Sequence, residues 1–207
     1  MSDKILLQYR KPNGFLGQLI ARSMNSSHHK MTNWGLDFIN IKNPKNILDI
    51  GCGGGRAITK LSVLFPDSTV YGIDYSKKSI DISTRVNKKN IKKGRVILKE
   101  ANVSSLPFEN DYFDLITAIE TYYFWSDLEY NMKEVLRVLK PNGLFLIISS
   151  VYKNDKFDKR NKSYVEKLNM HYHSAEDLNK LLSNTGFKNI KINEKYEKGW
   201  LCAITEK

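Results

Sequence analysis

The sequence predicts an α/β protein built on a doubly wound sheet of seven mostly parallel strands. Two observations support this prediction. Apolar runs of strand length alternate with segments of helical periodicity, which is typical of a parallel sheet covered by helices on both faces. The last two apolar runs follow one another without a helix between them, so we expect the final strand to be antiparallel. The 207 residues suit one domain of this kind, which buries about two thirds of its unfolded surface.

Each expected strand is a short apolar run bounded by polar residues, glycine or proline. The first strand, 46–50, is almost wholly apolar and runs into a cluster of glycines, as expected of a strand buried on both faces. The fifth begins after a Lys-Pro-Asn-Gly turn at 140–143. The seven expected strands cover residues 46–50, 69–74, 95–100, 112–120, 144–150, 187–193 and 199–205.

Helical periodicity and capping signals predict the helices between these strands. Apolar residues recur at helical spacing from Ile58 to Phe65, and a lysine-rich helix is expected over about 76–92. Ser126 and Glu129 fit a capping box at the start of a third helix. A fourth helix is expected from Ser174, with Asp177 in its first turn and Gly186 at a left-handed cap beyond its end.

Residues 1–45 precede the first strand and form a separate helical leader in this prediction. Two helical pieces are expected, at 13–30 and 31–41. Trp34, Phe38 and Ile41 share one stripe of the second piece, which favours packing over cofactor contact. A helical leader beside the open end of a sheet could serve as a lid. We therefore expect a helical lid segment, 1–45, followed by a ligand-binding domain, 46–207.

Cysteine usage and hydropathy indicate a soluble, cytoplasmic protein. Cys52 and Cys202 are the two cysteines of the sequence, which is typical of a reducing compartment. The first 15 residues lack the apolar core of a signal peptide, and no apolar run approaches the roughly 20 residues that span a bilayer. No membrane association is expected.

The net charge of +11 raises the alternative of a nucleic-acid partner, because basic surfaces bind phosphate backbones. The lysines are scattered along the chain in short groups such as Lys88-Lys89 and Lys92-Lys93. This distribution favours a solvated, lysine-biased surface. A nucleic-acid partner is disfavoured but stays open.

The glycines at 51, 53, 54 and 55 mark the expected ligand site. They lie at the carboxyl end of the first strand and the start of the first helix, where ligands bind in open α/β sheets. Free helix amides and missing side chains allow a ligand to approach the backbone closely. The dinucleotide fingerprint G-x-G-x-x-G does not fit, because its third glycine would fall on Arg56 or Ile58. The glycines therefore indicate a nucleotide-like ligand held by a different pattern.

The pattern Asp49-x-Gly51-x-Gly53-x-Gly55 resembles motif I of the class I S-adenosylmethionine-dependent methyltransferases. Asp74 ends the second strand at the distance where this family places an acid on the ribose hydroxyls. Segments 101–116 and 135–148 are similar to the family's adenine loop and to its following helix, turn and fifth strand. The resemblance covers about residues 46–150 and is strongest to the group of ubiquinone and menaquinone C-methyltransferases, the methyltransferase type 11 group. It implies a Rossmann-like fold and S-adenosyl-L-methionine as cofactor.

The resemblance also implies a set of cofactor-binding residues. One position departs from the family, which usually has aspartate where this chain has Asn102; an amide carbonyl can still accept from the adenine amino group, though less strongly. The expected cofactor-binding residues are Asp49, Gly51, Cys52, Gly53, Gly55, Asp74, Tyr75, Asn102, Val103 and Glu120.

The expected reaction is an in-line methyl transfer from a sulfonium, for which positioning supplies much of the rate acceleration. A general base is needed only where the acceptor loses a proton. Three residues are candidates for catalysis: Glu120, which could also face the amino acid part of the cofactor, Tyr122, and His28 in the leader. The aromatic run from Tyr122 to Trp125 could wall an acceptor pocket. No metal site is expected, because the four histidines lack carboxylates or cysteines at ligand spacing.

The missing motifs narrow the class of acceptor. DNA amino-methyltransferases of this fold carry an Asn/Asp-Pro-Pro-aromatic motif after the fourth strand, where this chain has IETYYF, and neither cysteine follows a proline as in cytosine C5 enzymes. These absences favour a small-molecule methyl acceptor. An RNA or protein acceptor, or a protein that binds the cofactor without turnover, remains an alternative, and the chain is expected to be a monomer or homodimer.

Overall fold

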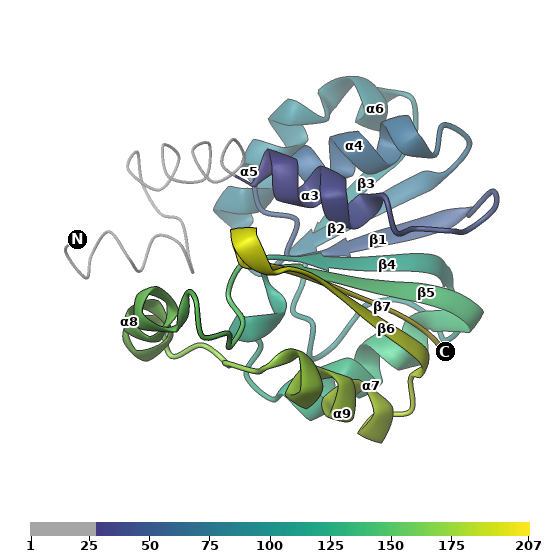
Figure 1. The fold of residues 1–207 in the computed structure, drawn as a ribbon. Coiled ribbons are helices and arrows are strands. Elements are labelled where there is room, and N and C mark those ends of the chain that lie inside the picture. The colour runs from purple at the N-terminus through teal and green to yellow at the C-terminus, as the bar shows by residue number, and fades with distance from the viewer. Residues whose placement is uncertain (1–27) are drawn as a thin grey trace.

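A computed structural model describes residues 28–207, which form one seven-stranded sheet with the strand order β3-β2-β1-β4-β5-β7-β6 (Figure 1). β7 runs antiparallel to both of its neighbours, and the other strands share one direction. The predicted α/β, doubly wound, Rossmann-like fold is confirmed. The strands are β1 (Asn46–Ile50), β2 (Thr69–Asp74), β3 (Val96–Glu100), β4 (Phe113–Ile119), β5 (Leu139–Ser149), β6 (Lys188–Lys195) and β7 (Trp200–Glu206).

Helices cover both faces of the sheet, as the βαβ pattern requires. α3, α4 and α5 lie on one face, α7 and α9 lie on the other, and α8 lies beyond the carboxyl ends of the parallel strands (Figure 1). The helices are α3 (His29–Leu36), α4 (Arg56–Leu64), α5 (Lys77–Val86), α6 (Lys88–Lys92), α7 (Leu128–Val138), α8 (Asp158–Leu168) and α9 (Ala175–Asn184).

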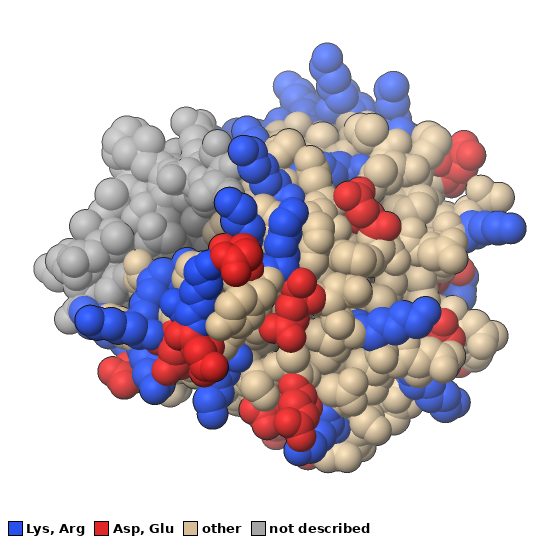
Figure 2. Space-filling view, viewed as in Figure 1, with Lys and Arg blue, Asp and Glu red and all other residues tan. Residues whose placement is uncertain are grey.

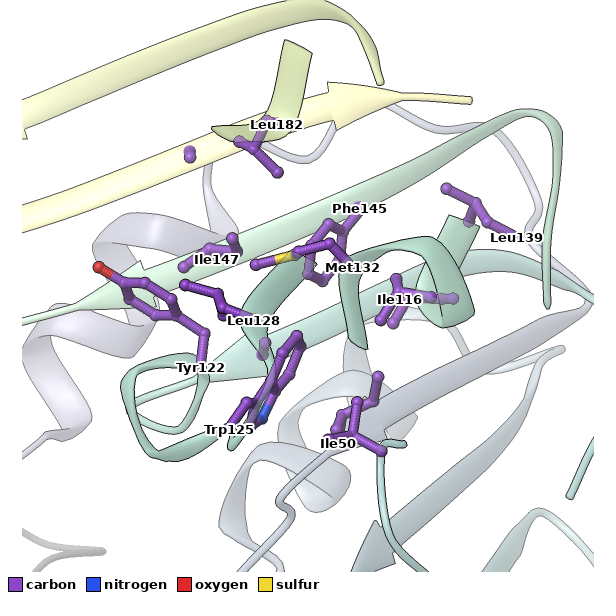
Figure 3. Packing of buried hydrophobic residues seen from close by; sticks show 14 of the residues in the cluster. Ile50, Ile116, Tyr122, Trp125, Leu128, Met132, Leu139, Phe145, Ile147 and Leu182 are labelled. Atoms are coloured by element: carbon purple, nitrogen blue, oxygen red, sulfur yellow. The ribbon is translucent and has the colours of Figure 1, made fainter. Parts of the chain in front are cut away.

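The central strands are buried on both faces and feed two hydrophobic clusters. Along β4, Leu115 belongs to the cluster under α3 and α4, whereas the next residue, Ile116, belongs to the cluster under α7 and α9. Figure 3 shows Ile116 and Phe145 packed beside Met132 of α7. This alternation explains why these strands read as continuous apolar runs.

The start of α7 differs from the predicted capping box. The helix begins one residue later than expected, and the side chain of Asp127 accepts from the Tyr130 amide at 3.0 Å. The prediction of a box formed by Ser126 and Glu129 was therefore wrong, since an aspartate next to the expected cap fills its role. The helix expected from Ser174 is confirmed as α9, and Ser174 and Asp177 form a capping box at its start.

The lysine-rich segment after β2 forms two helices rather than one. The break lies at Asn87, whose side-chain amide donates to the carbonyls of Gly55 at 2.9 Å and Ser83 at 3.1 Å, while its oxygen accepts from Thr59 at 2.8 Å. These bonds fasten the end of α5 to the glycine loop. The helix ends here because a buried polar side chain is anchored to the loop, which periodicity could not show.

One helix, α8, was not predicted from the sequence, and the strand β5 begins earlier than expected. α8 buries only Asn161 and Leu168, so it lacks the apolar stripe that reveals a surface helix. β5 begins at Leu139, before the expected turn, and Asn142 takes a left-handed φ of 62° inside this irregular start.

The leader is described only from His28, so the expected helix at 13–30 lies almost wholly outside the described residues. The second expected helix is observed as α3, which begins two residues earlier than expected and ends at Leu36 rather than at residue 41. Trp34 contacts the ring of Phe38 at 5.3 Å and that of Trp200 at 5.9 Å, measured between ring centroids. This confirms that the aromatic stripe packs. Within residues 28–207, no helix has the length and apolar character needed to cross a bilayer.

Two leucines of α4 test the packing directly. Leu61 is fully buried and Leu64 is 52% exposed. We expect Leu61→Ala to lower the free energy of unfolding by about 2–5 kcal/mol, because it leaves a cavity against the sheet. Leu64→Ala, the same change on the same helix, should cost less than about 1 kcal/mol. Urea denaturation measures both. Equal losses would contradict the packing of α4 described here.

Candidate functional site

A cleft opens at the carboxyl ends of β1, β2 and β4, with a cavity volume of about 210 Å³. It is bounded by the glycine loop after β1, the start of α3, and the loops after β3 and β4. The cleft brings together ten of the predicted site residues: His28, Asp49, Gly51, Cys52, Gly53, Asp74, Tyr75, Asn102, Val103 and Glu120. Gly55 and Tyr122 are not among its lining residues.

Gly51, Gly53 and Gly55 of the loop all have a positive φ, but the space around an added Cβ differs at each of them. At Gly51, an added Cβ would lie 2.3 Å from the hydroxyl oxygen of Thr121. At Gly55, it would lie 2.2 Å from the hydroxyl oxygen of Ser83, so this glycine serves packing against α5. At Gly53, the nearest atom would be 4.0 Å away, which leaves a bare backbone facing the cleft. The exposed backbone at Gly53 is the part of the loop suited to a ligand.

Asp74 fixes the shape of this loop. One carboxylate oxygen accepts from the Gly53 amide at 2.9 Å, and the other accepts from the Ser76 amide at 2.8 Å. Burial raises the pKa of Asp74, and these two amide bonds partly oppose the rise. The sequence identified Asp74 as a ligand contact but did not show that it also bridges the loop to the end of β2.

Asp49 is a second buried acid below the loop. It is 2% exposed, and one of its oxygens accepts from the Thr117 hydroxyl at 2.6 Å. Its pKa is raised to about 7, chiefly by burial and also by the charge of Asp74, while the Thr117 bond opposes the rise. A carboxyl group in this setting is readily ionised by a neighbouring cation.

Cys52 lies between these acids and is not suited to nucleophilic chemistry. Burial, and then the charges of Asp74 and Asp49, raise the pKa of its thiol well above its ordinary value. The thiol therefore stays protonated and serves packing.

Glu120 and His28 meet in the same cleft, although they lie far apart in the sequence. His28 Nε2 lies 3.5 Å from Glu120 Oε2, with the His28 side chain 31% exposed and that of Glu120 7% exposed. Glu120 takes a left-handed φ of 57°, which is uncommon for a residue other than glycine and clusters at functional sites. Its carboxylate accepts from the amide and hydroxyl of Ser150.

Comparison with known proteins gives the family. A model described as a methyltransferase domain matches residues 48–147. O-methyltransferase rstn1 of Aspergillus nomiae is 30% identical over 155 residues, which are 72% of this chain and 67% of that protein. The chain belongs to the class I S-adenosylmethionine-dependent methyltransferases.

Other relatives are longer than this chain or share only its fold. Sterol 24-C-methyltransferase erg6 of Aspergillus fumigatus is 30% identical over 147 residues, which are 69% of this chain but 37% of that protein. The chain spans about half or less of the length of several curated relatives that it matches. A Haloferax volcanii methyltransferase, solved in complex with the activator Trm112, has a TM-score of 0.81 and 15% identity, and covers 100% of this chain and 98% of its own. This likeness supports the fold alone.

The residues of this methyltransferase fit S-adenosylmethionine. Gly53 leaves a cradle that a Cβ would fill, and the two buried acids Asp49 and Asp74 offer negative charge beside it. The ligand carries a sulfonium and an ammonium group, so its charge complements this end of the cleft.

At the expected adenine side of the methyltransferase site, the side chain of Asn102 is hydrogen-bonded within its own loop. The side-chain oxygen of Asn102 accepts from the amide and hydroxyl of Ser104, at 3.0 Å and 2.8 Å. An Asx turn therefore occupies the atom expected to meet an adenine amino group. Val103 is 8% exposed and Tyr75 is 43% exposed, and both line the cleft.

The aromatic run after β4 divides between the cleft and the core. Phe124 and Trp125 line the cleft. Tyr122 is fully buried, and Figure 3 shows its ring among Leu128 and Ile147. The structure therefore places Tyr122 away from the site that its neighbours form. Tyr123 is also buried, at 4% exposure.

Two residues that the sequence analysis missed hold the cleft together. Lys60 lines the cleft and donates to Asn33 at 2.6 Å and to the His29 carbonyl at 3.1 Å, which fastens α3 to α4. His171 Nε2 lies 2.7 Å from the Trp125 carbonyl oxygen and supports the aromatic loop. No sequence signal marks these contacts, because each joins elements distant in the chain. Among residues 28–207, no group of three or more His, Cys, Asp or Glu side chains could hold a metal ion.

A comparison of two glycines with positive φ can distinguish loss of the cofactor contact from strain in the backbone. Gly53 (φ 49°) faces the cleft, whereas Gly94 (φ 70°) lies in a turn with no atom within 4 Å of an added Cβ. We expect Gly53→Val to weaken S-adenosylmethionine binding more than about 100-fold and Gly94→Val to leave it unchanged, since both strain the backbone but only one fills the cradle. Calorimetric titration measures binding, and circular dichroism checks folding. Wild-type affinity in folded Gly53→Val would remove the loop from the site.

Proposed function

We propose that this methyltransferase acts on a small molecule that loses a proton on methylation, such as a hydroxyl compound or an acidic carbon. The observation that carries the proposal is the meeting of His28 and Glu120 beside the aromatic residues Phe124 and Trp125 in one cleft. Small apolar walls with a few polar groups are typical of small-molecule sites. The names of two relatives, an O-methyltransferase and a sterol methyltransferase, support this class of acceptor.

The proposed cofactor contacts come from residues that line the cleft. Asp49 and the loop at Gly53 hold the methionine half, and Asp74 accepts from the ribose hydroxyls. Tyr75 and Val103 flank the adenine, and Asn102 meets its amino group after exchanging its bond with Ser104. When bound, S-adenosylmethionine supplies an electrophilic methyl group on a sulfonium sulfur.

In the proposed mechanism the chain positions the acceptor and removes its proton. Nε2 of His28 faces the Glu120 carboxylate, which leaves Nδ1 to accept the proton of the acceptor. The carboxylate then stabilises the imidazolium that forms, as in other acid-histidine pairs. We further propose that the protein works in a reducing cytoplasm, since Cys52 and Cys202 are both buried and free.

An RNA acceptor is the alternative that the charge of +11 keeps open. On the face shown in Figure 2, Lys and Arg side chains lie over several elements with Asp and Glu among them, and no single basic band crosses it. This distribution favours the small-molecule proposal.

Binding of the cofactor is expected to depend on the ionisation of Asp49. Its pKa of about 7 is above its ordinary value, so the free protein is largely protonated there at pH 6. The cationic ligand favours the carboxylate, hence affinity rises with pH and should be about fivefold higher at pH 7 than at pH 6. Calorimetric titration at constant ionic strength measures this. Asp49→Asn is the control and should change less than about twofold over the same range. An equally steep rise in the variant would show that another group titrates.

The class of acceptor can be tested with radiolabelled S-adenosylmethionine. The protein is incubated with one cell extract divided into small molecules, RNA and protein, and label is counted in each fraction. We expect label in the small molecules, and Glu120→Gln should lower the rate by about 100-fold or more, because the proton acceptor loses its partner. Label in RNA or protein would overturn the small-molecule proposal. Cofactor binding without label anywhere would indicate a binding protein.

A further inference from the structure

The carboxylate of Glu120 is held by Ser150 through two hydrogen bonds, and the side chain of the buried Tyr123 also hydrogen-bonds to it. Ser150 follows the last residue of β5 and donates its amide to Oε1 at 2.5 Å and its hydroxyl to Oε2 at 2.7 Å. The same Oε2 lies 3.5 Å from His28 Nε2. Ser150 therefore donates a hydrogen bond to each oxygen of the carboxylate. The oxygen that faces His28, Oε2, is the one that accepts from the Ser150 hydroxyl.

The backbone explains why this grip is possible. β4 and β5 pair up to Ile119 and Ile148, and the Glu120 amide then donates to the Ile148 carbonyl at 2.9 Å. The left-handed φ of Glu120 turns the chain at this point. The two strands end side by side, so their next residues, Glu120 and Ser150, can meet.

Ser150 is itself held in place from α8. Arg160 Nη2 donates to the Ser150 carbonyl at 3.3 Å, and the fully buried Asn161 donates to the Tyr152 carbonyl at 3.2 Å. α3 and α8 approach the strand ends from different sides (Figure 1). A chain of contacts thus runs from α8 through Ser150 and Glu120 to His28 at the start of α3.

We propose that Ser150 is a positioning residue that aims the Glu120 carboxylate at His28. This rests on the proposed function, in which the Glu120–His28 pair removes the acceptor proton. A group that orients a catalytic side chain need not touch the substrate. Loss of the hydrogen-bond partners that orient metal-ligating side chains typically lowers activity or affinity by about 10-fold to 100-fold, and we expect an effect of this order here. Without the hydroxyl of Ser150, Oε2 loses the donor that holds it beside the imidazole, and the Ser150 amide and Tyr123 remain as partners of the carboxylate.

The first test measures the interaction between His28 and Glu120 directly and needs no methyl acceptor. Protein labelled with ¹⁵N in its histidines is compared at pH 7 without ligand, following the ring nitrogen resonances of His28. Glu120→Gln removes the charge beside Nε2 and should shift that resonance. Ser150→Ala should shift it in the same direction by at least about half as much, because the carboxylate leaves its place. Ser150→Thr keeps the hydroxyl and should match the wild type, as should Ser163→Ala, an exposed serine of α8.

The outcomes separate this inference from the proposed function. A wild-type resonance in folded Ser150→Ala, beside a shift in Glu120→Gln, would overturn the role of Ser150 and leave the acid-histidine pair intact. No shift in either variant would overturn both the pair and its positioning. With the labelled acceptor fraction, Ser150→Ala should lower kcat about 10-fold or more with S-adenosylmethionine affinity unchanged, and Ser150→Thr should restore it. Failure to label any small molecule would count against the proposed function. The resonance test could still be interpreted, because it needs no acceptor.

Discussion

The two hydrogen bonds of the Asp74 carboxylate are the contact on which the cofactor site depends. They join the Gly53 amide to the Ser76 amide, so the loop after β1 is fixed against the end of β2 and the start of α5. The left-handed turns at Gly51 and Gly53 can then leave a bare backbone at the cleft without collapsing into it. The loop is also anchored from behind, where Asn87 bonds the Gly55 carbonyl. One acid therefore shapes the cradle as well as lining it.

Three acidic side chains line the cleft of this basic chain, together with Arg56 and Lys60. Asp49, Asp74 and Glu120 converge on one cleft in a protein with a net charge of +11. Burial disfavours the charged form of Asp49 and Asp74, as their raised pKa values show. A ligand with a sulfonium and an ammonium group relieves this penalty, so the cleft is suited to the cofactor rather than to an anion. In the same cleft, Glu120 meets its own positive partner in His28 when that imidazole takes up a proton.

The sequence predicted the parts that depend on local pattern. The strands and most helices follow from alternation of apolar runs, and the glycines and Asp74 are recognisable because backbone geometry and strand ends constrain them. Predictions from local pattern were wrong where a particular side-chain hydrogen bond determines where a helix begins or ends. Asp127 rather than Ser126 caps α7, and Asn87 breaks a helix by bonding to the distant glycine loop. α8 was missed because it buries only Asn161 and Leu168.

The same limit applies to the acceptor end of the site. His28 and Glu120 were each candidates from the sequence, but only the fold shows that they meet, because the pair joins the leader to the end of β4. Tyr122 looked equivalent to Phe124 and Trp125 in the sequence. The short helical turn at 122–124 sends its ring into the core beside Leu128 instead. The backbone after β4 therefore decides two things at once: the left-handed Glu120 directs a carboxylate to His28, and the turn that follows selects which aromatic rings reach the acceptor. A substitution that relaxed this turn would disturb the proton acceptor and the pocket wall together, while Asp74 would still hold the Gly53 amide.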